Sequence, residues 1–324
     1  MRTFLTEFRK LFSNRIFLLI ISAVLILNAY LMFKTANSGD VTPSDYKQIY
    51  TELENKTDKE KLSWLENQMN DFSQEPVYNR EAISELYHEC NDIVTYKEYL
   101  NAIDSQAKSM TSISIFANPD TFNYRSIIKT PPAYRNVRNV EPVFDVSKGL
   151  NLALDNSFTN IFCGFILLFA VLSLMISDRE QGMSGLLFSL KRGRGYLFSV
   201  KLAALAVVAF CTVILLYSEN LIISAYLYGL GDLSRPIQSL NGFIGCNLKL
   251  NVASYLVVFA LFQFAALFSI CAVLSLIAVI TKNTISFYSI SAAVMIAEGF
   301  LYSFVDSLSV YSIFRYINLI AFTK

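Results

Sequence analysis

FTNIFCGFILLFAVLSLMIS, residues 158–177, is the stretch of sequence that decides the fold class. The hydrocarbon core of a bilayer is about 30 Å thick, so an α-helix needs about 20 mostly apolar residues to cross it. This run has that length and contains no charged residue. It therefore predicts a transmembrane helix.

Four further runs have the same apolar character; they cover residues 16–33, 199–228, 252–280 and 285–304. Of the 324 residues, 54% are hydrophobic and only 16% are charged, whereas a typical soluble domain has about 25% charged residues. The predicted fold class is an all-α integral membrane protein with about five transmembrane helices, an N-terminal interfacial helix and a mainly helical external domain.

The first apolar run, 16–33, is predicted to stay in the protein as a membrane anchor. Its length exceeds the 7–15 residues of a signal-peptide core, and no small-x-small cleavage site follows it. Residues 1–13 place Phe4, Phe8 and Leu11 on one helical face with basic residues opposite, which is typical of a helix lying in the membrane interface. The alternative is a simple N-terminal extension of the first span.

The distribution of basic residues predicts the orientation of the chain. The N-terminus, the segment between the second and third runs and the short link at Lys282 together hold 10 basic and 3 acidic residues. The other segments outside the runs hold 17 basic and 21 acidic residues. By the positive-inside rule, we expect a cytoplasmic N-terminus and an external segment 34–157.

Four parts follow from these boundaries. Residues 1–33 form the interfacial elbow helix and the first transmembrane helix, and residues 158–305 form a four-helix transmembrane bundle. Residues 34–157 form an extracellular domain, with a pair of long helices first and then, where prolines gather, irregular chain with a few short strands. Residues 306–324 form an external re-entrant segment.

The segment between the second and third runs reads SDREQGMSGLLFSLKRGRG, residues 177–195. Ser177 and Glu180 have the spacing of a capping box, which starts a helix by satisfying unpaired N–H groups. Basic residues at the other end favour the negative helix C-terminus, and Gly193 can supply a left-handed cap. We therefore expect a separate amphipathic helix over 178–192.

The sequence gives no sign of metal or nucleotide chemistry. It contains no phosphate-binding G-x-x-x-x-G-K-[ST] motif and no H-E-x-x-H pair, and its single histidine, His88, is expected to be a solvated or packing residue. The five cysteines lack C-x-x-C spacing. The sequence leaves open whether Cys90 and Cys246 form a disulfide. A net charge of +1 gives no reason to expect nucleic acid.

Three residues inside the apolar runs are candidates for function, the two carboxylates Glu219 and Glu298 and the amide Gln263. A carboxylate in a bilayer costs several kcal/mol, about 2.5–3.5 on insertion scales, so each glutamate needs a partner or water. One interpretation is that these residues line a substrate path. The other is structural: the carboxylates reach the headgroups or bond to Tyr217, Ser218 and Tyr302, and Gln263 joins helices.

The layout resembles the type-2 permeases of ABC transporters. The resemblance rests on an interfacial helix, one span, a large external insertion, a second span and then a loop of the form D-R-E-x-G-x-x-x-L-L-x-S-x-x-x-G-R-x-x-x-x-x-x-K. In this chain the loop motif consists of Asp178, Arg179, Glu180, Gly182, Leu186, Leu187, Ser189, Gly193, Arg194 and Lys201.

The resemblance implies a bacterial exporter permease in the cytoplasmic membrane, surrounded by lipid and paired with a second permease chain. This chain would be no enzyme and bind no cofactor, because a cytosolic ATPase subunit would hold the ATP and Mg and dock on the helix at 178–192. The docking residues would be Asp178, Arg179, Glu180, Gly182, Arg192 and Arg194.

The family pattern has six spans, one more than the sequence shows, so the resemblance implies either that the chain is truncated at its C-terminus or that the remainder is a separate region. An antimicrobial peptide or a drug is the expected substrate by analogy. The alternative is a non-transporting sensor or scaffold whose extracellular domain binds a ligand.

Overall fold

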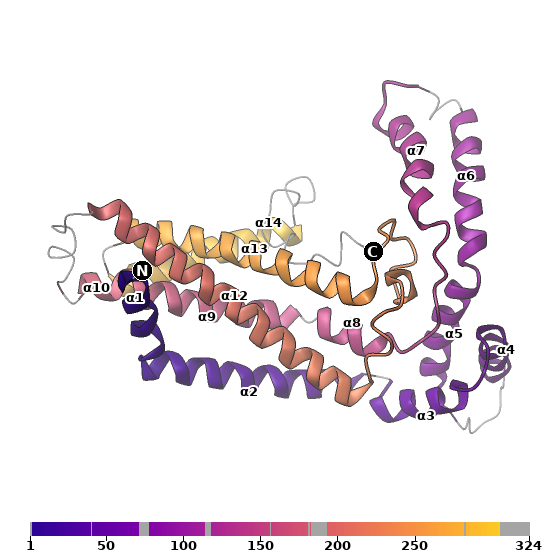
Figure 1. Cartoon of the computed structure of the whole chain (residues 1–324), viewed down its shortest axis with the longest axis horizontal. Helices are drawn as coiled ribbons and strands as arrows, with labels where there is room; N and C mark the ends of the chain where they lie inside the picture. Colours follow the sequence, from indigo (N-terminus) through magenta and orange to yellow (C-terminus); the bar gives the residue numbers. More distant parts are fainter. Residues whose placement is uncertain are drawn as a thin grey trace. The chain divides into compact units, whose positions relative to one another are not determined.

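The computed structural model describes residues 2–39, 41–70, 78–113, 118–155, 157–180, 182, 193–281 and 283–304. Within these residues the secondary structure is helical, apart from one isolated bridge between Pro236 and Asn251 (Figure 1). The chain divides into two compact units. Unit 1 contains residues 1–34, 153–223 and 257–322, and unit 2 contains 35–152, 224–256 and 323–324.

Unit 1 consists mainly of long apolar helices. They are α1 (Arg2–Phe12), α2 (Arg15–Ser38), α9 (Ser157–Val171), the π-helical segment η2 (Leu172–Ile176), α10 (Ser177–Glu180), α12 (Gly193–Leu227), α13 (Val252–Ile280) and α14 (Thr284–Phe304). Ser13 and Asn14 separate α1 from α2, and the Asn14 side chain accepts a hydrogen bond from Ile16 N at 3.0 Å. The N-terminal helix is therefore a separate element and not an extension of the first span.

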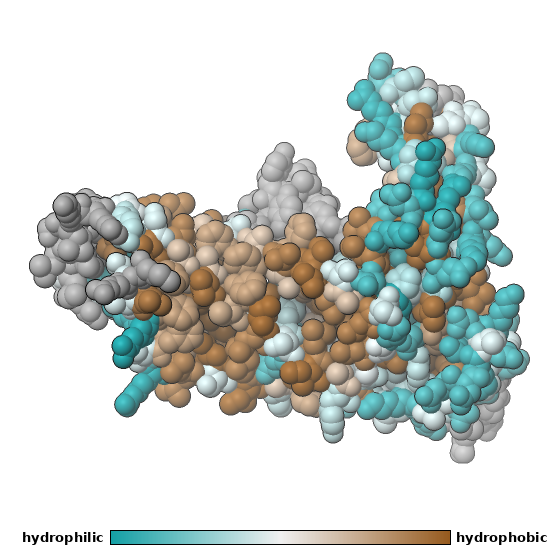
Figure 2. Space-filling model, in the orientation of Figure 1, coloured by the Kyte–Doolittle hydropathy of each residue, from teal (hydrophilic) through white to brown (hydrophobic). Residues whose placement is uncertain are grey.

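Among the described residues, four segments are long and apolar enough to cross a membrane: Arg15–Ser38, Lys148–Ile176, Gly195–Leu227 and Val252–Ile280. The fifth predicted span corresponds to α14, an apolar helix of 21 residues, of which the part with described side chains is Thr284–Glu298. Large apolar side chains of these helices are exposed; Ile26 and Ile296, for example, are both 72% exposed. Figure 2 shows hydrophobic residues over much of the visible face of unit 1, a surface that suits lipid and not water.

Unit 2 has shorter helices with polar outer faces (Figure 2). They are α3 (Pro43–Leu53), α4 (Asp58–Met69), α5 (Arg80–Val94), α6 (Tyr96–Ser112), α7 (Phe122–Ala133), α8 (Lys148–Leu154) and the 3-10 turns η1 (Arg135–Val137) and η3 (Ile237–Ser239). Two long helices were predicted for its first half, but caps divide this region into four. Thr57 and Glu60 form a capping box that starts α4, and the Asn79 side chain caps α5.

Helix α7 was not predicted. Irregular chain was expected here because prolines usually end helices. Thr121 starts the helix by accepting a hydrogen bond from Tyr124 N at 3.3 Å, and Pro131 and Pro132 fall near its C-terminal end, so only its last turns carry proline. The expected short strands are absent from the described residues between 118 and 155.

Unit 2 also includes the connection after α12, which the sequence did not assign to the domain before it. The Asp145 carboxylate accepts hydrogen bonds from Tyr50 Oη at 2.8 Å and from Asp232 N at 2.6 Å. Arg235 lies 3.5 Å from the same carboxylate and donates to Val146 O. A glycine is needed at 231, where φ is 64° and a Cβ would lie 2.6 Å from Asp145 Oδ2.

Candidate functional site

The predicted docking segment is only partly described. Arg192 and residues 183–191 lie outside the described residues, as do the side chains of Arg179, Glu180 and Arg194. Gly182 is exposed and has a φ of 69°, a conformation that favours glycine. The segment 306–324, predicted to be re-entrant, also lies outside the described residues.

The predicted start of the loop helix is wrong. Ser177 has φ −53° and ψ −39°, which are helical angles, whereas a capping residue takes an extended conformation. The helical run that begins at Ser157 continues through the π-helical segment as far as Glu180. Gly193 is the first residue of α12 and not a left-handed cap, whereas Gly182 does have a positive φ.

Asp178 is the buried centre of an ion cluster that also contains the buried Lys201 and the exposed Lys10. Its side chain is only 3% exposed, and its two carboxylate oxygens bond to different lysines, Lys10 from α1 and Lys201 from α12. Lys201 is itself buried and donates a further hydrogen bond to Leu174 O in the π-helical segment. One carboxylate therefore joins α1, α10 and α12.

The charges in this cluster offset one another. Burial raises the pKa of the Asp178 carboxyl, but the hydrogen bonds and positive charges of Lys10 and Lys201 outweigh burial, so the pKa lies below its ordinary value. Asp178 is thus held as a carboxylate. Removing one partner from a buried ion pair usually costs about 3–5 kcal/mol, because it leaves a charge without compensation.

The role predicted for Asp178 changes with this position. A carboxylate inside the unit does not face outward toward another protein, so Asp178 positions helices, while Gly182 lies on the surface. The sequence did contain a signal for the cluster, since Lys201 belongs to the loop motif. Nothing in the spacing identified Lys10, because its partner lies 168 positions away.

A second polar cluster lies between α2, α9 and α12, inside the predicted spans. Asn28 Nδ2 donates to Glu219 Oε2 at 2.9 Å and to Asn220 Oδ1 at 2.8 Å. Thr159 donates to Asn28 Oδ1 at 2.9 Å and accepts from Asn220 Nδ2 at 2.8 Å. Asn28, Thr159 and Asn220 are fully buried, and Glu219 is half-buried.

This cluster supplies Glu219 with a partner that the sequence analysis did not name. Ser218 bonds to Leu215 O in its own helix, and Tyr217 donates to Asn160 Oδ1 at 2.8 Å, so neither holds the carboxylate in these contacts. The side chain of Tyr302 is outside the described residues. The signal in the sequence was Asn28, the most polar residue of the first run.

Gln263 and Glu298 lie on other helices. Gln263 is buried on α13, and Glu298 is half-buried on α14, so neither is on the three helices that form the Asn28 cluster. Cys90 and Cys246 are both free thiols, and the disulfide left open above is not formed. His88 is exposed.

Among the described residues, no three His, Cys, Asp or Glu side chains come together in a way that could hold a metal ion. What the two clusters can do is mechanical: each ties an N-terminal helix to α12 and to the helical run that ends at Glu180. No protein-family model, curated protein or solved structure matches the chain.

Proposed function

We propose that this chain is the membrane-spanning permease subunit of an ATP-driven ABC exporter in a bacterial cytoplasmic membrane. Its N-terminus would be cytoplasmic, a separate cytosolic subunit would bind ATP and Mg, and two permease chains would enclose the path. The proposal rests on the D-R-E-x-G loop motif at 178–201 and on the apolar helices that flank it.

The observation that carries the proposal is the ion cluster of Asp178, Lys10 and Lys201. The cluster lies at the start of the proposed docking segment 178–192, four residues before the exposed Gly182. An exporter must convert closure of its ATPase into movement of its spans. A push on this segment would move α10, and the buried pair of Asp178 with Lys201 would carry the movement to α12, because a buried ion pair resists separation. The pair with the exposed Lys10 would link the same carboxylate to α1.

The π-helical segment next to Asp178 supports the same role. π-Helical turns are less regular than α-helix and are often found at functional sites. Lys201 donates to a carbonyl of this segment, Leu174 O. Movement of α10 would therefore displace the second span as well as α12.

Co-purification tests the proposal. The tagged chain is isolated from its native membrane in mild detergent, and an ATP-binding subunit is expected with it. The double variant Glu180→Lys, Arg194→Glu is expected to lose that subunit. Lys201→Met is expected to keep the subunit but to lose most stimulation of ATP hydrolysis, since the transmitting ion pair is gone.

Lys249→Glu is the control, because Lys249 is exposed in unit 2 and should leave both measurements unchanged. Membrane insertion and thermal unfolding of every variant show whether it folds. A chain that emerges repeatedly without an ATPase would overturn the exporter proposal in favour of a sensor or scaffold.

A further inference from the structure

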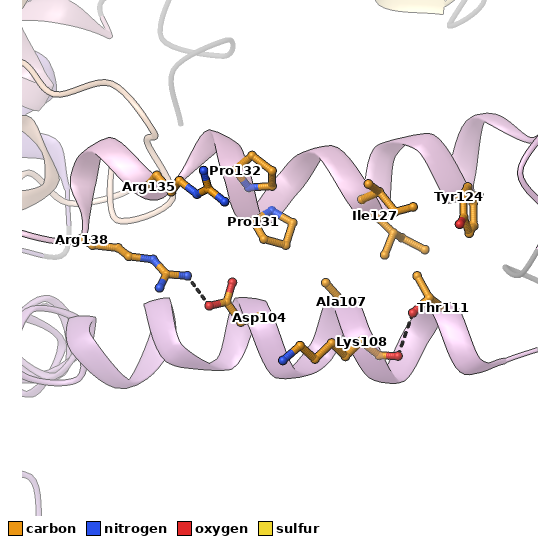
Figure 3. Close-up of a pocket in the computed structure, with 11 residues that line it drawn as sticks. Asp104, Ala107, Lys108, Thr111, Tyr124, Ile127, Pro131, Pro132, Arg135 and Arg138 are labelled. Carbon is orange, nitrogen blue, oxygen red and sulfur yellow. Dashed lines mark hydrogen bonds and ion pairs between the residues drawn. The ribbon is translucent and has the colours of Figure 1, made fainter.

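A groove of about 530 Å³ lies between α6 and α7 within unit 2. The two helices run side by side, and side chains from both face the space between them (Figure 3). Pockets of about 300–1,000 Å³ are typical of small-molecule sites. The groove is lined by Asp104, Ala107, Lys108, Thr111, Tyr124, Ile127, Ile128, Pro131, Pro132, Arg135 and Arg138.

The groove has an excess of positive charge. Three of its side chains are basic and one is acidic. Arg138 and Asp104 pair with each other, whereas Lys108 and Arg135 form no ion pair with any described residue. Figure 3 shows Arg135 and Arg138 toward one end of the groove. This end is therefore suited to an anion, and guanidinium groups match the geometry of phosphate oxygens.

The rest of the groove is largely apolar. Ile127 and Tyr124 lie farther along it in Figure 3, away from the two arginines. Beyond them, large apolar side chains are exposed on the same part of the chain: Phe122 is 83% exposed, and Met110 and Ile113 are also exposed. Met110 lies in the last turn of α6 and Phe122 is the first residue of α7, so an apolar chain that follows the groove past Tyr124 runs toward them.

We propose that this groove binds an anionic amphiphile, a lipid with a phosphate monoester headgroup. The phosphate would lie at the Arg135 end, Lys108 on α6 would add a second positive charge to the groove, and the acyl chain would cover Ile127 and continue toward Phe122. A free phosphate ion would leave most of the volume and all of the apolar wall unused. A cationic peptide would meet two uncompensated positive charges. The inference does not depend on the exporter proposal, because binding needs only unit 2.

Calorimetry on the full chain in phosphatidylcholine nanodiscs tests this assignment. The probe is dioctanoyl phosphatidic acid below its micelle concentration, compared with dioctanoyl phosphatidylcholine and with inorganic phosphate. Saturable binding is expected for phosphatidic acid, and Arg135→Glu is expected to weaken it about tenfold or more, because a charge-assisted contact becomes repulsive.

The matched control is Lys129→Glu, the same change of charge at an exposed position of α7 outside the groove, and it should leave the affinity unchanged. Ile127→Ser should weaken the binding of phosphatidic acid and leave any binding of inorganic phosphate unaffected. Circular dichroism checks the helix content of each variant.

Three results would overturn the assignment. Equal affinity for phosphatidylcholine would show that the groove does not recognise an anionic headgroup. Competition by inorganic phosphate at the same concentration as the lipid would make free phosphate the ligand. Equal losses in Arg135→Glu and Lys129→Glu would mean that the attraction is a general one to the positive charge of α7 and not to the groove.

Discussion

Glu89 shows how far the surroundings of a single residue can change its chemistry. It lies on α5 in unit 2, is 5% exposed, and accepts a hydrogen bond from the Ser147 hydroxyl. Burial, and then repulsion by Glu85, raise its pKa to about 8, although the positive charges of Arg235 and Lys148 act in the opposite direction. At neutral pH this side chain is therefore mostly protonated.

The raised pKa of Glu89 predicts that the stability of the chain falls with rising pH. Between the ordinary pKa of 4.5 and the folded value of about 8, the folded state holds a proton that the unfolded state has lost. The contribution is complete below the lower value and is lost as pH rises toward the upper one. Glu89→Gln keeps an acceptor for Ser147 and cannot titrate, so its unfolding temperature should depend less on pH.

Thermal unfolding of the purified chain from roughly pH 5 to pH 9 makes the comparison. Glu81→Gln, at an exposed position of the same helix, is the control and should follow the unmodified chain. Parallel curves for the unmodified chain and Glu89→Gln would contradict the prediction.

At the scale of elements, helix ends and close contacts decide what the helices do. The helical run after Ser157 continues through a π-helical segment to Glu180, and this places Asp178 beside Lys10 and Lys201. In unit 2, helix α8 approaches the turn after α12 so closely that a Cβ at Gly149 would lie 2.0 Å from Gly229 O. The contact is with backbone, which cannot change rotamer to make room as a side chain can.

Gly149→Ala should therefore destabilise unit 2. Forcing an extra methyl group into a filled contact typically costs about 1–3 kcal/mol, and here it would push α8 off the turn. Chemical denaturation in detergent measures the loss. Gly164→Ala is the matched control, since its Cβ would meet only Met295 Cε at an ordinary 3.8 Å. Equal stability of the two variants would contradict the packing described for α8.

At the scale of the whole molecule, the distribution of charge and apolar surface predicts the side of the membrane on which each part lies. Basic residues gather near Lys10 and along the segment that precedes α12, whereas residues 34–157 carry an acidic balance. By the positive-inside rule, we expect the first group in the cytoplasm and the second outside.

Labelling of intact cells tests this topology. Lys129→Cys should react with a membrane-impermeant maleimide from outside, because the position is exposed in unit 2. Arg9→Cys, also at an exposed position, should react only after the cells are opened. The unmodified chain controls for Cys211, the exposed native cysteine. Labelling of Arg9→Cys in intact cells, with protection of Lys129→Cys, would reverse the proposed orientation.

The sequence by itself determined that the chain is helical and that at least four of its helices could cross a membrane. This was possible because apolar length is a local property, which can be summed along 20 residues without knowing what they contact. The separate N-terminal helix was predicted for the same reason: its two faces are visible within 12 residues. The loop motif and the polar residues Glu219 and Asn28 could also be identified directly in the sequence.

Only the tertiary structure decided which of those residues meet. Asp178 was predicted to face a partner and is instead enclosed by Lys10 and Lys201, and Glu219 bonds to Asn28, 191 positions away. The inclusion of 224–256 in unit 2 also depended on distant contacts. The physical reason is that hydrogen bonds and ion pairs act over about 3 Å between atoms that the sequence leaves far apart, so no local pattern specifies them.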